Sequence, residues 1–92
     1  MAISGQTTVT TAGTAVAMGS QRIDGALLVK ALDTNSGLVA LGNDGANDVT
    51  VSNGLRLAVG EEVYFQWVGD LTSVYLDSAV NGDGVSWLAL NV

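Results

Sequence analysis

The chain has 92 residues and a formal net charge of −6, because nine acidic side chains outnumber three basic ones, Arg22, Lys30 and Arg56. Three scattered cations lack the clustered positive charge that nucleic acids and anionic membranes attract, so neither is expected as a partner. Without histidine or cysteine the chain has no Ser-His-Asp triad, Cys-His nucleophile or usual zinc ligand set, so we expect no enzyme, no resident metal and no cofactor.

The chain alternates short apolar runs of period two with clusters of Gly, Asn and Asp, which indicates strands joined by turns. The expected strands span 7–11, 14–18, 25–32, 38–42, 48–52, 55–58, 62–68, 73–78 and 85–92. Residues 1–11 are either part of a first strand or an extended N-terminal arm. The expected turns lie at Asn35-Ser36-Gly37, Asn43-Asp44-Gly45, Asn53-Gly54, Gly69-Asp70 and Asn81-Gly82-Asp83-Gly84.

This pattern predicts an all-β fold: a single antiparallel β-sandwich or jelly-roll-like barrel of about eight short strands, forming one domain over residues 1–92. No window indicates an amphipathic helix. No stretch approaches the roughly 20 apolar residues of a membrane span, and the N-terminal residues lack the basic and apolar regions of a signal peptide.

Three of the expected strands are apolar on both faces, although a strand of a two-layer sandwich has only one core face. In 62–68 we expect Val63, Phe65 and Trp67 in the core. Either covering loops or a subunit interface explains the second apolar face of 25–32 and 85–92. The candidate interface anchors are Tyr64, Tyr75, Trp87, Leu88 and Leu90.

Oxygen-bearing side chains cluster at Asp44, Asn47 and Asp48, and Asp83 lies in a later turn. Calcium takes such ligands, but the spacing does not match an EF-hand loop, and Asn, Asp and Gly are also the usual turn residues. We interpret these residues as turns and leave open whether the 44–48 loop binds a cation.

The order TTVTTAGTAVAM, VKAL, TNSGLVALGNDG, SNGLRLAVGEEVYF and VYLDSAVNGDGVSWLAL resembles small virion proteins of tailed bacteriophages, some of which are capsid decoration or cement proteins. The resemblance covers nearly the whole chain and consists of turn-and-strand patterns. The most recognisable are Asn53-Gly54-Leu55 followed by Gly60-Glu61, and Val74–Ser78 leading into Gly82–Leu88.

The resemblance implies a protein made in the host cytoplasm that binds the outer capsid surface, with the major capsid protein and copies of itself as partners. A homotrimer is the implied oligomer, and a dimer is the alternative. Two other functions stay open: a tail, head-fibre or spike module, and a carbohydrate-binding β-sandwich in which Tyr64, Tyr75 or Trp87 would stack on a sugar beside polar side chains.

Overall fold

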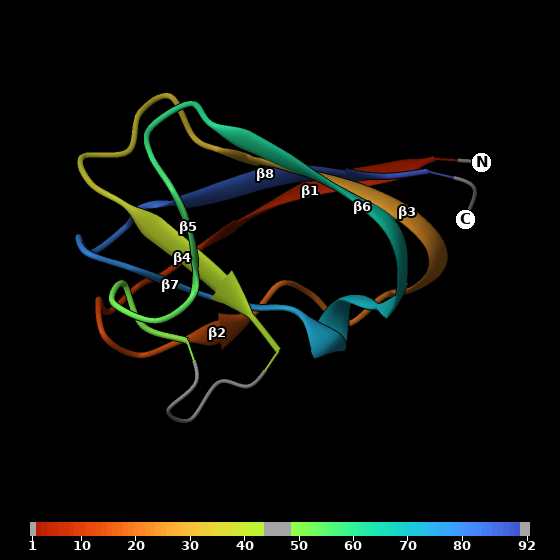
Figure 1. Ribbon diagram of the computed structural model, residues 1–92, viewed down its shortest axis with the longest axis horizontal. Coiled ribbons are helices and arrows are strands. Elements are labelled where there is room, and N and C mark those ends of the chain that lie inside the picture. Colours follow the sequence, from red (N-terminus) through yellow and green to blue (C-terminus); the bar gives the residue numbers. More distant parts are fainter. Residues whose placement is uncertain (1, 44–48, 91–92) are drawn as a thin grey trace.

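The computed structural model describes residues 2–43 and 49–90, and its regular secondary structure consists almost entirely of strands (Figure 1). Its regular elements are β1 (Ile3–Thr8), β2 (Val16–Ala17), β3 (Arg22–Ala31), β4 (Val39–Gly42), β5 (Leu55–Leu57), β6 (Glu62–Asp70), a 3-10 turn η1 (Leu71–Ser73), β7 (Tyr75–Ser78) and β8 (Gly84–Ala89).

The strands form two four-stranded sheets, with orders β1-β8-β3-β6 and β2-β7-β4-β5, and every pair is antiparallel. The pairing is nested: β1 pairs with β8, β2 with β7, β3 with β6 and β4 with β5. The chain therefore behaves as one long hairpin folded over into two layers, which is the strand arrangement of a jelly roll. The expected antiparallel β-sandwich is confirmed.

The core lies between the inner faces of the two sheets, and period-two alternation explains its composition. In β3, Leu27, Val29 and Ala31 are buried while Leu28 and Lys30 face outward. From β8, Val85 and Ala89 enter the same core. The remaining buried members of the cluster come from both sheets and their connections: Val9, Met18, Ile23, Val39, Leu41, Leu57, Leu71 and Leu76.

The outer face of β2-β7-β4-β5 is covered by loops. Ala40 and Asp77, which point away from the core, are both buried. A Cβ added to Gly54 would lie 2.8 Å from the Cβ of Ala40, so the 49–54 segment lies directly on this sheet. The Asp77 carboxylate accepts a hydrogen bond from the Gly13 N–H at 2.9 Å, which ties down the β1–β2 connection. Loops therefore cover the second face in this sheet.

Buried polar groups join the β3–β4 and β7–β8 connections. The Asp83 carboxylate accepts hydrogen bonds from the backbone N–H groups of Ser36 and Gly37, with its shortest contacts at 2.9 Å. The expected turns there are present, and Asp83 is committed to backbone groups within its own fold.

Several expected boundaries are wrong. Of the two alternatives for residues 1–11, the structure has the first strand, which lies at the edge of β8 and spans residues 3–8 where 7–11 was expected. The described part of 48–52 is a turn closed by Thr50 and Asn53, where a strand was expected. Gly69 and Asp70 lie inside β6, so the chain turns later, at η1. The Asn43-Asp44-Gly45 turn falls largely outside the described residues.

Candidate functional site

The outer face of β1-β8-β3-β6 carries a row of apolar side chains. Leu28 is paired with Leu88 on one side and with Tyr64 on the other, so the three side chains lie side by side across three strands. Tyr64 is 56% exposed and Leu88 is 37% exposed. We call Leu88, Leu28 and Tyr64 the outer row. The adjacent pair Lys30 and Glu62 places one positive and one negative group beside it.

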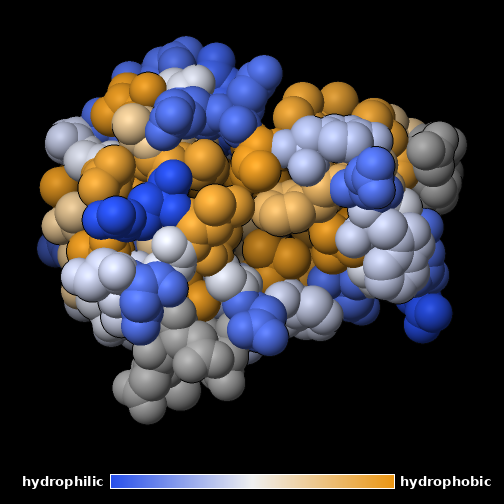
Figure 2. All heavy atoms as spheres, viewed as in Figure 1, coloured by the Kyte–Doolittle hydropathy of each residue, from blue (hydrophilic) through white to orange (hydrophobic). Residues whose placement is uncertain are grey.

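A second apolar surface lies where the two sheets part, beside edge strands β5 and β6. Figure 2 shows apolar side chains gathered in a hollow on this side of the molecule. The hollow, which we call the edge groove, has a volume of about 410 Å³, and Leu41, Leu55, Phe65 and Val74 supply its apolar lining. Leu55 is 49% exposed although it is aliphatic. Edge strands also present unpaired backbone groups, which extended segments of other chains can pair with.

A third surface arises from two compensating β-bulges between β3 and β6. From Leu27–Phe65 to Gly25–Val68 the chain advances two residues on β3 and three on β6; from there to Arg22–Asp70 it advances three on β3 and two on β6. The extra residue on β6 breaks the alternation and turns Trp67 outward, where it is 65% exposed. Bulges re-aim side chains in this way and are frequent beside binding sites.

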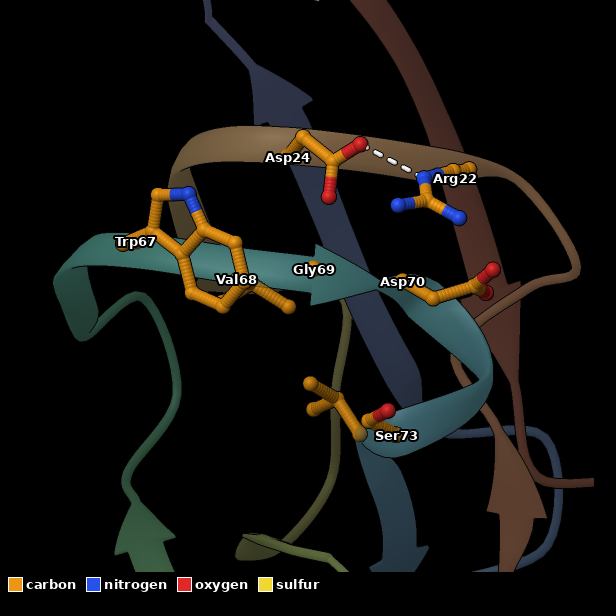
Figure 3. A pocket seen from close by; sticks show the side chains of 8 residues that line it. Arg22, Asp24, Trp67, Val68, Gly69, Asp70 and Ser73 are labelled. Atoms are coloured by element: carbon orange, nitrogen blue, oxygen red, sulfur yellow. Dashed lines mark hydrogen bonds and ion pairs between the residues drawn. The ribbon is translucent and has the colours of Figure 1, made fainter.

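The second bulge contains Asp24, whose φ of 40° lies in the left-handed region. Asp is one of the few non-glycine residues that tolerates this conformation. Asp24 Oδ2 accepts a hydrogen bond from Arg22 Nε at 2.6 Å, and this interaction raises the pKa of the Arg22 guanidinium above its ordinary value. Figure 3 shows the indole of Trp67 at one end of a shallow groove, with the Arg22–Asp24 pair and Asp70 toward the other.

Asp70 caps η1. Its Oδ1 accepts hydrogen bonds from the backbone N–H and the hydroxyl of Thr72, both at 2.9 Å. These bonds, with a smaller contribution from Arg22, hold the pKa of Asp70 below its ordinary value. The carboxylate is therefore ionised throughout the neutral range.

The other expected anchors lie in different places. Trp87 is on the inner face of β8, half-buried against the core, and its ring lies over Gly5. Tyr75 is half-buried in β7, between Ala17 and Gly42. Leu90 follows β8 and donates its backbone N–H to the Ala26 carbonyl. The structure thus brings Tyr64 and Leu88 together on the outer row and separates Trp87 from them.

The expectation that Trp67 is a core residue is wrong, and the bulge is the reason. Alternation from Val63 and Phe65 predicts an inward Trp67, but the extra residue puts Val68 on the inner side instead. The available signal in the sequence is Gly69, since glycine inside a strand pattern often marks a bulge or a close approach.

Among the described residues, no cluster of three or more acidic side chains is arranged to hold a metal ion. Asp44, Asn47 and Asp48 lie outside these residues. In the described ranges, no helix has the length and apolar character needed to cross a membrane.

Comparison with protein-family models, with curated proteins and with solved structures gives no significant match.

Proposed function

We propose that this protein is a structural component of a tailed-phage virion: a decoration protein that binds the outer capsid surface as a homo-oligomer and stabilises the shell. The observation that carries the proposal is the outer row. Leu88, Leu28 and Tyr64 form an uncovered apolar strip on a sheet whose counterpart is covered by its own loops. Uncovered apolar strips of this kind mark protein contacts.

The outer row fits a second copy of this chain. Lys30 and Glu62 lie beside it with opposite charges, so two copies packed face to face, or arranged around a closed ring, can match one group with the other. Opposite charges matter here because the copies carry a net charge of −6 each and repel one another elsewhere. A trimer or a dimer is expected.

The edge groove fits an extended segment of the major capsid protein. Its apolar floor supplies side-chain contacts, and the free edges of β5 and β6 supply backbone hydrogen bonds, which is the combination that strand addition uses. A tail or spike module would use the outer row equally well, but it would have no need of a capsid contact. Substitutions in the edge groove therefore distinguish a decoration protein, which needs the capsid contact, from a module that does not.

The test combines purified undecorated shells of the parent phage with the protein and follows shell disruption during heating. Bound protein should co-sediment with shells and raise the temperature at which they break. Light scattering on the free protein should give two or three times the 9.3 kDa chain mass. Shells that neither bind the protein nor gain stability would overturn the decoration role.

A further inference from the structure

We infer that the double bulge of β3 and β6 is a saccharide-binding site, in which Trp67 stacks on a sugar ring while Arg22, Asp24 and Asp70 bind its hydroxyl groups. This inference does not depend on the decoration role. It rests on the groove of about 530 Å³ at the bulges, a volume within the roughly 300–1,000 Å³ of small-molecule sites.

The indole of Trp67 is held as a platform. A Cβ added to Gly69 would lie 3.0 Å from Cη2 and 3.5 Å from Cζ3 of Trp67, so the six-membered ring rests close to the Gly69 backbone. Trp67 as a residue is nevertheless 65% exposed, which leaves surface free for a ligand. The electron-rich face of an indole attracts the weakly positive C–H groups on the flat side of a pyranose.

The polar groups beside this platform supply both donors and acceptors. Arg22 Nε donates a hydrogen bond to Asp24 Oδ2. Within the described residues, Asp24 Oδ1 and the two Nη groups of Arg22 have no hydrogen-bond partner. Asp70 uses Oδ1 for Thr72 and keeps Oδ2 for a ligand. A sugar hydroxyl donates to a carboxylate and accepts from a guanidinium, so neighbouring hydroxyls match this set.

The mixture of one guanidinium and two carboxylates suits a neutral polyol, whose hydroxyl groups can both donate to and accept from these side chains. One guanidinium offsets one of the two carboxylates, and both carboxylates raise the pKa of the Arg22 guanidinium, Asp24 more than Asp70. A quaternary ammonium ligand would take an aromatic face without a competing guanidinium, and a phosphate or sulfate would meet two carboxylates. A sugar ring uses all four side chains.

The structure of the bulges also argues for a site. Asp24 occupies a left-handed conformation, which residues other than glycine seldom adopt. Trp67 leaves water in contact with a large apolar surface. Asp24 and Trp67 lie on the paired strands β3 and β6, beside each other in one sheet. A saccharide-binding site would account for both features.

The test is a glycan array probed with the full chain, followed by titration of each positive with the free saccharide under NMR observation of the Trp67 and Trp87 indole N–H signals. We expect binding with a dissociation constant near the millimolar range and a shift of the Trp67 signal. Trp67→Ala should weaken binding by at least about tenfold, a loss of about 1.4 kcal/mol.

Two further variants keep the test independent of folding. Asp24→Asn removes a charged acceptor but suits the left-handed backbone, so it should weaken binding while circular dichroism stays unchanged. Gly69→Ala changes no polar group but places a methyl under the indole, and it should weaken binding by displacing the platform. Val59→Ala is the control, since Val59 is an exposed apolar residue outside the groove and outside the outer row, and it should bind as the wild type does.

Absence of any positive glycan, or binding that survives Trp67→Ala, would overturn the inference. Tetramethylammonium serves as a second probe in the same titration. If it shifts the Trp67 signal and no saccharide does, the site is a cation site and the saccharide assignment is wrong.

Discussion

The side-chain amide of Asn35 and the backbone of Gly84 exchange two hydrogen bonds. Asn35 Nδ2 donates to the Gly84 carbonyl at 2.8 Å, and the Gly84 N–H donates to Asn35 Oδ1 at 2.9 Å. Asn35 is buried, so its amide takes the place of a neighbouring strand where β8 begins. Asp83, the residue before Gly84, also joins the two connections, because its carboxylate accepts a hydrogen bond from the Gly37 N–H in the β3–β4 loop.

Replacing Asn35 with alanine should therefore destabilise the fold by about 2 kcal/mol, because it leaves the buried Gly84 N–H without a partner. The Gly84 carbonyl keeps a second donor, the N–H of Leu32 at 3.1 Å, which limits the loss. Urea unfolding measures the change, with Thr34→Ala as the control at an exposed neighbour. Equal stability of the two variants would mean that the amide contributes nothing.

Gly84→Ala should be more damaging than Gly82→Ala. A Cβ on Gly84 would lie 2.2 Å from the Thr7 carbonyl oxygen and 2.7 Å from the Thr8 Cα, so β1 must separate from β8. We expect a loss of about 3 kcal/mol or more. Gly82 has a φ of 87° with open space around it, so alanine there brings only backbone strain, about 1 kcal/mol. Comparing the two unfolding curves separates steric from conformational effects.

The two tryptophans should respond differently to truncation. Trp67→Ala should change the free energy of unfolding by about 0.5 kcal/mol or less, because the side chain is mostly in water. Trp87→Ala should cost about 2–4 kcal/mol, since its ring packs against the core and over Gly5. Thermal unfolding of both variants provides the measurement. A large loss at Trp67 would place it in the core after all.

The stability contribution of Asp70 should depend on pH in a defined direction. Its folded-state pKa is lowered by the Thr72 hydrogen bonds and then by Arg22, so the contribution is complete above the ordinary carboxyl value of 3.8. It is lost as the pH falls through the lower folded-state pKa.

Asp70→Asn keeps a capping oxygen but does not titrate. The stability difference between wild type and this variant should therefore shrink as acid is added. Added salt should change it little, because hydrogen bonds outweigh the attraction by Arg22. A difference that is constant from neutral to acidic pH would contradict the expected shift.

Charge substitutions can separate the two proposed protein contacts. Leu88→Lys should abolish self-association, because it places an ammonium group in the outer row. Leu55→Lys should leave the oligomer intact but lose shell binding, because it charges the edge groove. Val59→Lys is the matched control, an exposed aliphatic residue outside both surfaces, and should change neither property. Light scattering and co-sedimentation with shells give the two readouts.

Those assignments fail if Leu88→Lys unfolds the chain or remains oligomeric, or if Leu55→Lys binds shells normally. Circular dichroism distinguishes an unfolded variant from a folded monomer.

The sequence was sufficient for the fold class and for the inward faces of β3 and β8, because Leu27, Val29 and Val85 follow simple alternation. It was insufficient wherever the outcome depends on a partner strand. The bulge that turns Trp67 outward is a property of two paired strands, and Gly69-Asp70 reads as a turn until that pairing is known.

Likewise, Val49 and Val51 alternate with polar residues as in a strand, yet the described part of this segment lies as a turn over Gly42 and Ala40. Ile3–Thr8 has little apolar character and becomes a strand because β8 offers it an edge. The sequence predicts the exposure of Tyr64 and Leu88 in the outer row but gives no indication of the groove at Trp67.

The nested pairing sets the order in which the molecule can fold. β4 and β5 are the only strands of the described chain that pair with their immediate successor or predecessor, whereas β1 must wait for β8. On a ribosome, the first strand emerges long before its partner exists, so completion of its sheet is a late event. Such long sequence separations make folding slow, in the millisecond-to-second range of all-β domains. During that wait, the edge of β1 is available to the same strand of another nascent copy.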